Sequence, residues 1–154
     1  METKSRKTIA ISGGMDPVHA GHITMIEKAR LLGDVIMILN NDNWLMSKKG
    51  YVFMNELDRA KIMYNIKGVT EVYITKHIEN DPDRTVCNAL RKIKPDMFGN
   101  GGDRKPGTTP EVELCNELGI ELVWNLDDSS TRDIHSSDLV KHAQDCIDKI
   151  EGAK

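Results

Sequence analysis

The stretch SGGMDPVHAGH at residues 12–22 decides the fold class of this chain. An apolar run at residues 8–11 precedes it and an amphipathic run at residues 23–32 follows it, so the segment predicts a strand, a glycine-rich turn and a helix. A helix N-terminus presents unpaired backbone N–H groups and the positive end of the helix dipole, and both favour a bound phosphate. We therefore expect the turn to bind the phosphates of a nucleotide.

Two features of this turn strengthen the expectation. Gly13 and Gly14 allow a polyphosphate to approach the backbone closely, and His19 and His22 add two imidazoles, neutral or cationic, at the helix entrance. The alternatives are simple turn punctuation, a Walker loop, a dinucleotide fingerprint or half a metal site. No Gly-Lys-Ser/Thr follows, the dinucleotide spacing fails, and no Cys pair or His-Glu-x-x-His supports a metal site. The residues expected to bind the nucleotide here are Ser12, Gly13, Gly14, Asp16 and Gly21.

Length and composition indicate one soluble globular domain spanning residues 1–154, with 39% hydrophobic and 29% charged residues. The formal net charge of −3 argues against broad electrostatic binding of nucleic acid or membranes. No apolar run approaches a membrane span and the start of the chain has no signal-peptide core, so we expect a cytoplasmic protein. Cys87, Cys115 and Cys146 are widely separated and are expected to pack as small apolar side chains.

Short apolar runs alternate with helical patterns along the chain. Strands are predicted at residues 8–12, 35–39, 72–75, 96–99 and 121–124, and helices at residues 21–32, 55–66, 82–93, 110–118 and 136–150. This alternation predicts an α/β, Rossmann-like open parallel sheet of about five strands with helices on both faces. The core is expected at about residues 8–140, followed by the C-terminal helix, which carries apolar residues at helical spacing.

Polar and glycine-rich segments follow four of the predicted strands. They begin at Gly13, Asn40, Asn100 and Asp127. Ligands of open α/β sheets bind beyond the carboxyl ends of the strands, so these four loops are expected to form one site.

The pattern G-x-x-D-x-x-H-x-G-H, carried by Gly13, Asp16, His19, Gly21 and His22, resembles the HxGH signature of the cytidylyltransferase-like nucleotidyltransferases. The resemblance covers about residues 8–140. It implies transfer of CMP or AMP from CTP or ATP to a small phosphorylated acceptor (a polyol, amino-alcohol or sugar phosphate), with release of pyrophosphate. It also implies Mg²⁺ as cofactor and a homodimer. In this interpretation both histidines donate hydrogen bonds to phosphate oxygens, and Asp16 either orders the turn or helps to hold the metal.

The resemblance assigns further catalytic residues outside the signature. The polar segment at residues 41–50 is expected to be a mobile loop, in which Lys48 or Lys49 closes over the triphosphate; the alternative is a solvated surface loop. Asn55 is a good N-cap for the following helix. Arg59 either pairs with an acidic neighbour on a solvated face or anchors phosphate or a loop, and the resemblance favours the second alternative.

Two later segments are also expected to reach the nucleotide. The run NGGDRKPG at residues 100–107 resembles the Gly-Gly-Asp-x-Lys-Pro element of heptose-phosphate adenylyltransferases, which favours a sugar phosphate as acceptor; the alternative is a turn with solvated charges. Near residues 129–138, a serine is expected to cap the last helix and to contribute to a second phosphate or base site. The residues assigned to binding here are Gly101, Gly102, Asp103, Arg132, Ser136 and Ser137. A rival to the enzyme is a catalytically silent nucleotide-binding regulatory domain of the same fold.

Overall fold

The computed structural model describes residues 5–101, 107–126 and 135–153. Its sheet has five parallel strands in the order β3-β2-β1-β4-β5. The strands are β1 (Thr8–Gly13), β2 (Asp34–Leu39), β3 (Val69–Ile74), β4 (Met97–Gly99) and β5 (Glu121–Val123). The described helices are α1 (Ala20–Leu32), α2 (Asp42–Lys49), α3 (Glu56–Tyr64), α4 (Cys87–Ile93), α5 (Pro110–Leu118) and α6 (Ser136–Gly152). This architecture confirms the predicted Rossmann-like fold.

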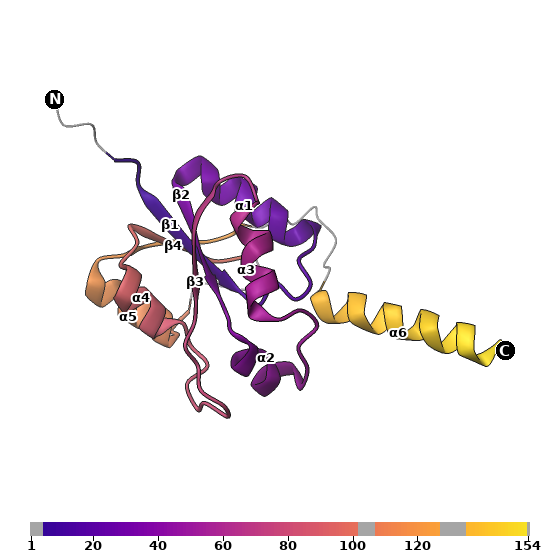
Figure 1. Ribbon diagram of the computed structural model, residues 1–154. Helices are drawn as coiled ribbons and strands as arrows, with labels where there is room; N and C mark the ends of the chain where they lie inside the picture. Colours follow the sequence, from indigo (N-terminus) through magenta and orange to yellow (C-terminus); the bar gives the residue numbers. More distant parts are fainter. Residues whose placement is uncertain (1–4, 102–106, 127–134, 154) are drawn as a thin grey trace.

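Helices cover both faces of the sheet (Figure 1). On one face, Ile26 of α1 and Met63 of α3 pack against one set of strand residues, including Ile9. On the other face, Leu90 of α4 and Leu114 of α5 pack against the alternate strand residues. Successive strand residues point to opposite faces of the sheet, and helices cover both faces, so the central strands carry apolar residues on both sides. The carboxyl ends of all five parallel strands then lie at one edge, as expected.

Two elements differ from the prediction. Residues 42–49 form the helix α2 instead of a mobile loop, because the Asn41 side chain caps the Trp44 N–H at 3.0 Å and Gly50 ends the helix at a positive φ of 79°. Helix α4 begins at Cys87 and not at residue 82. The Asp83 carboxylate accepts hydrogen bonds from the backbone and the hydroxyl of Thr85, and this local turn competes with helix formation.

Helix α6 extends away from the sheet and its helices (Figure 1). Its apolar side chains are not packed in the core, since Leu139 is 40%, Ile147 47% and Ile150 62% exposed. Cys146, also on α6, is exposed, which corrects the expectation of burial, whereas Cys87 and Cys115 are buried as expected. In the part of the chain that the structure describes, no helix combines the length and the apolar character needed to span a membrane.

Candidate active site

His19 and His22 cap the start of α1 reciprocally. His19 is the N-cap residue, and its Nδ1 accepts a hydrogen bond from the Gly21 N–H at 3.1 Å. The His19 N–H in turn donates to His22 Nδ1 at 3.1 Å, and the two rings stack with their centroids 3.8 Å apart. Since both Nδ1 atoms accept, each neutral ring carries its proton on Nε2. The site thus presents two Nε2–H donors at a helix N-terminus.

Burial and nearby positive charge keep both rings neutral at pH 7. Burial is the main cause that lowers the pKa of His22 to about 4, and the charges of His19 and Lys49 lower it further. The pKa of His19 is lowered by burial first, then by His135 and Lys49. Of the two protonation states considered from the sequence, the free protein therefore holds the neutral one.

Gly21 is required by this capping arrangement. A Cβ added at Gly21 would lie 2.9 Å from Cε1 and 3.1 Å from Nδ1 of His19, closer than ordinary contacts. Any side chain at this position would push the His19 ring off the backbone that it caps. The spacing His-x-Gly-His is explained by this close approach.

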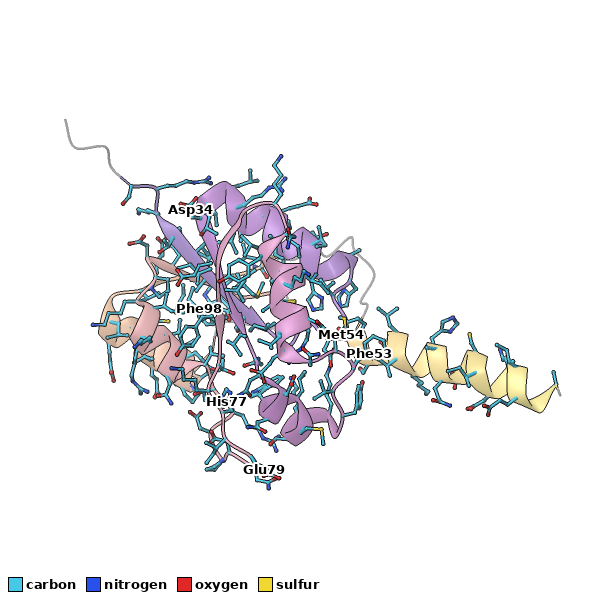
Figure 2. The ribbon with its side chains drawn as sticks, in the orientation of Figure 1. Asp34, Phe53, Met54, His77, Glu79 and Phe98 are labelled. Atoms are coloured by element: carbon cyan, nitrogen blue, oxygen red, sulfur yellow. The ribbon has the colours of Figure 1, made fainter. Side chains whose placement is uncertain are left out.

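Asp16 orders the turn between β1 and α1. Its side chain is fully buried, and its two oxygens accept hydrogen bonds of 2.7 Å from the N–H groups of Phe53 and Met54. Figure 2 shows these two residues on the segment that leads into α3. Of the two roles considered for Asp16, the structure shows the ordering role. Among the described residues, no group of three or more His, Cys, Asp or Glu side chains is placed to hold a metal ion.

Arg59 is fully buried and ties three loops together. Its Nε donates to the Met54 carbonyl at 2.8 Å, and its Nη1 donates to the carbonyls of Gly14 at 2.8 Å and Asn40 at 2.6 Å. Its Nη2 pairs with the Asp42 carboxylate at 2.6 Å. The solvated-face interpretation is therefore wrong, and the guanidinium anchors loops. Because the guanidinium has no exposed surface in this conformation, it anchors loops and not phosphate, and Arg59 is a positioning residue.

The two lysines at the end of α2 face different groups. Lys48 Nζ lies 4.7 Å from the ring centroid of Trp44, a cation–π distance. Lys49 lies close enough to the histidines for its charge to lower the pKa of each. The sequence left the choice between the two open, and of the two only Lys49 is among the charges that lower the pKa of both histidines.

The start of α6 meets the first turn. The Ser136 hydroxyl is buried and donates to the Pro17 carbonyl at 2.7 Å, while Ser137 is exposed. The N-cap of α6 is His135, which corrects the expected serine cap. Ser12, Gly13, Gly14 and Gly101 are half-buried at the carboxyl edge of the sheet. Gly102, Asp103 and Arg132 lie outside the described residues.

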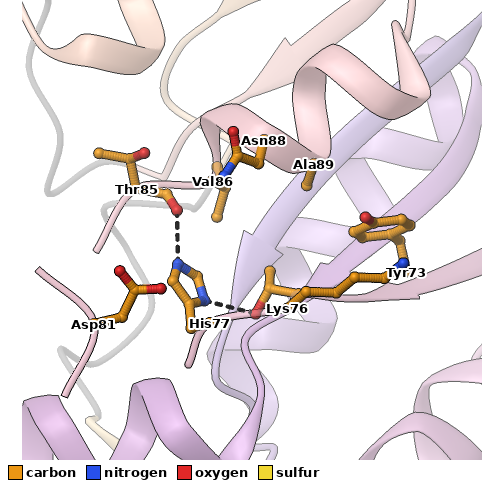
Figure 3. Close-up of a pocket in the computed structure, with 9 residues that line it drawn as sticks. Tyr73, Lys76, His77, Asp81, Thr85, Val86, Asn88 and Ala89 are labelled. Atoms are coloured by element: carbon orange, nitrogen blue, oxygen red, sulfur yellow. Dashed lines mark hydrogen bonds between the residues drawn. The ribbon is translucent and has the colours of Figure 1, made fainter. Parts of the chain in front are cut away.

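A pocket beside the end of β3 was missed by the sequence analysis. It has a volume of about 190 Å³, and Figure 3 shows His77 at its centre with Lys76 and Asn88 around it. His77 Nδ1 lies 2.9 Å from the Thr75 hydroxyl and Nε2 lies 2.9 Å from the Thr85 carbonyl, so Nε2 carries the proton and donates. His77 is a lone histidine in a loop, and nothing in the local sequence predicts its hydrogen bonds to Thr75 and Thr85.

The chain belongs to the cytidylyltransferase-like family, whose family model matches residues 10–150. It is 32% identical over 138 residues to the bifunctional protein HldE of Desulfatibacillum aliphaticivorans, covering 86% of this chain and 27% of that protein. It is also 32% identical over 124 residues to the FAD synthase of Thermococcus onnurineus, covering 78% and 79% of the two chains.

A solved structure confirms the fold. The lipopolysaccharide core biosynthesis protein of Thermoplasma volcanium superposes with a TM-score of 0.64 at 20% identity, covering 81% of this chain and 100% of that chain. The present chain spans only about a quarter of the length of the HldE proteins that it matches.

Proposed function

We propose that the protein transfers a nucleoside monophosphate from ATP or CTP to a small phosphorylated acceptor and releases pyrophosphate. The observation that carries this proposal is the pair of neutral Nε2–H donors of His19 and His22 at the N-terminus of α1. Donors fixed in this way stabilise charge that develops on phosphate oxygens without having to reorganise. Lys49, whose charge already acts on both rings, supplies the positive charge for the leaving pyrophosphate.

The proposed reaction is an in-line attack of an acceptor phosphate oxygen on the α-phosphorus. A new P–O bond forms to the acceptor while the bond between the α-phosphorus and the bridging oxygen breaks, and the electron pair leaves with pyrophosphate. No covalent enzyme intermediate is needed, so positioning and electrostatics carry the catalysis. Arg59 and Asp16 contribute by holding the Gly14, Asn40 and Met54 backbones in place.

Two parts of the sequence favour different acceptor classes: the NGGDRKPG run favours a sugar phosphate, and the HxGH signature favours CTP with a polyol or amino-alcohol phosphate. The NGGDRKPG run resembles the element of heptose-phosphate adenylyltransferases, and several HldE proteins are among the relatives. Because the chain matches only part of those proteins, polyol and amino-alcohol phosphates stay in the proposal.

Mg²⁺ is an expectation from the family resemblance. Both oxygens of Asp16, the metal ligand considered from the sequence, accept backbone hydrogen bonds. The described side chains therefore do not form a protein cage for the ion, and no step proposed above passes through a metal. In phosphoryl-transfer sites Mg²⁺ is usually held in large part by substrate phosphates.

Pyrophosphate release tests the proposed function. ATP and CTP are each combined with a heptose 1-phosphate, glycerol 3-phosphate and ethanolamine phosphate, in the presence of Mg²⁺. The proposal expects one pair to release pyrophosphate well above the rate without acceptor, and the His22→Ala variant to lose this release. Nucleotide binding without release from any pair would instead support the silent regulatory domain.

A further inference from the structure

Two buried side-chain amides lack hydrogen-bond partners. Asn40 is 4% and Asn100 is 6% exposed. Within the described part of the chain, the Asn40 Oδ1 and the Asn100 Nδ2 are the buried side-chain atoms for which no partner is found. Buried polar atoms in folded proteins nearly always have a partner, because leaving one unpaired is costly. Each of these two atoms therefore calls for an explanation.

Both residues flank the phosphate-binding turn at the same edge of the sheet. Asn40 directly follows β2 and Asn100 directly follows β4, and these two strands are the neighbours of β1. Each residue adds one backbone hydrogen bond to the sheet beyond the end of its strand. The Asn40 N–H donates to the Gly13 carbonyl, and the Asn100 N–H donates to the Val123 carbonyl. Strand alternation then places both on the face that carries Ile38 and Phe98.

The backbones of both residues are fixed, so the amides are held in place. The Asn40 carbonyl accepts from Arg59, and the Asn100 carbonyl accepts from the Leu126 N–H at 3.1 Å. Two strands separated by β1 lie about 10 Å apart, a span wider than a single sugar ring. The two amides therefore contact separate parts of whatever binds over the turn.

The hydrogen-bonding chemistry of the two unpaired amide atoms indicates which kind of ligand group can pair with each of them. Oδ1 needs a donor and Nδ2 needs an acceptor, and a hydroxyl group is both. We propose that Asn40 and Asn100 are specificity-determining residues, each binding a hydroxyl group of a substrate, on opposite sides of the Gly13–Gly14 turn. The inference rests on the proposed function, which names the two substrates that carry hydroxyl groups. These groups are on the ribose of the nucleotide and on the carbon chain of the phosphorylated acceptor.

The test uses Asn40→Leu and Asn100→Leu, with Asn116→Leu on the exposed face of α5 as matched control. Affinities for ATP, CTP and their 2′-deoxy and 3′-deoxy forms are measured by calorimetry, and the KM for the acceptor is measured by pyrophosphate release. The Asn40→Ala and Asn100→Ala variants replace any leucine variant that does not fold. Melting temperatures without ligand are recorded for all variants.

We expect the free variants to melt within about 2 °C of the wild type, because replacing an unpaired buried amide removes no hydrogen bond. Each variant should weaken one ligand roughly threefold to tenfold, the range of one hydrogen bond. If the hydroxyl belongs to the ribose, the wild type should bind the matching deoxynucleotide more weakly than the normal nucleotide. The variant should then bind the two forms with equal affinity. If it belongs to the acceptor, nucleotide affinity is unchanged and the acceptor KM rises.

Two results would overturn the inference. One is that both leucine variants keep the wild-type affinity for the nucleotides and the wild-type KM for the acceptor. The other is a large loss of melting temperature in the free variants, which would show that the amides are already paired within the protein. A wild type that binds nucleotide but releases no pyrophosphate would refute the proposed function alone, since the deoxynucleotide titrations still decide whether either amide contacts ribose.

Discussion

The N–H of His19 donates to Nδ1 of His22, three residues further along the chain, at 3.1 Å. With the Gly21 N–H donating to Nδ1 of His19, this contact sets the tautomer of both rings before any substrate binds. The same two hydrogen bonds satisfy backbone N–H groups that a helix start leaves unpaired. One pair of residues thus caps the helix and orients the groups that we propose to bind the phosphates.

A His22→Ala variant should fold and lose most of its turnover. Loss of one preorganised donor at a developing charge costs on the order of 10²–10³ in kcat. Loss of the cap should also cost about 1 kcal/mol of unfolding free energy. Steady-state pyrophosphate release and chemical denaturation measure the two effects.

The His22→Gln variant separates these two effects. Glutamine at the third helical position accepts from the N-cap backbone N–H, as in a capping box, so stability should return towards the wild type while turnover stays low. Recovery of turnover in this variant would show that His22 acts only as a cap.

The lowered pKa of His22 predicts that stability falls in mild acid. Between pH 6.5 and about 4 the unfolded chain binds a proton at His22 that the folded chain does not, so the unfolding free energy decreases as pH falls through this range. The loss from pH 7 to pH 5 should be on the order of 1–2 kcal/mol. Urea denaturation at the two pH values measures it, with His22→Gln as control. An equal loss in the control would assign the effect to other groups.

Lys49 and Lys48 form a matched pair for testing the phosphate contact. Lys49→Ala should lower kcat/KM by about 10² if its charge neutralises the leaving group, while Lys48→Ala, which removes a contact with Trp44, should change it less than threefold. Lys49→Ala should also raise the pKa of His22, because a positive charge that lowers it is gone. Steady-state kinetics and NMR titration of the histidines measure both. An equal loss of kcat/KM in the two variants would contradict the assignment of Lys49 over Lys48 to the leaving group.

The first strand, turn and helix could be predicted because their signals are local. The glycines, the histidines and the flanking apolar runs all lie within residues 8–32, and the helix cap is formed by contacts between near neighbours in sequence. The hydrogen bonds from Phe53 and Met54 to Asp16, by contrast, come from a distant segment and could not be predicted. The Asn55 cap is also local and is confirmed, since its side chain accepts from the Asp58 N–H at 2.9 Å.

Elements that depend on distant contacts were predicted less well. Residues 41–50 were expected to form a loop, yet α2 forms there. Its caps at Asn41 and Gly50 are local, but its Trp44 Nε1 also donates to the Arg84 carbonyl, 40 residues away. The role of Arg59 depends on carbonyls and a carboxylate up to 45 residues away, which no local spacing reveals. Burial of an arginine is decided by the assembled fold and not by its own helix.

Arg59 is expected to matter for stability more than any exposed arginine. An Arg59→Met variant would leave the partly exposed Asp42 carboxylate and three carbonyls without their donor, at a total cost of about 3–5 kcal/mol for the groups left unpaired. For a chain of this size that corresponds to roughly 6–20 °C in melting temperature. Arg91→Ala, which removes an exposed hydrogen bond to Asn88, should shift the melting temperature by less than about 2 °C. Thermal denaturation compares them, and similar shifts would contradict the anchoring role.

Asp16→Asn tests whether this carboxylate orders the turn or holds a metal. An amide NH₂ would face a backbone N–H in place of one of the two oxygens that now accept from Phe53 and Met54. The mismatch should cost about 1–3 kcal/mol, seen as a lower melting temperature in the absence of Mg²⁺. If the role is ordering alone, the Mg²⁺ concentration that gives half-maximal turnover stays at the wild-type value although the maximum falls. A shift of that concentration by tenfold or more, with unchanged stability in the absence of Mg²⁺, would instead make Asp16 a metal ligand.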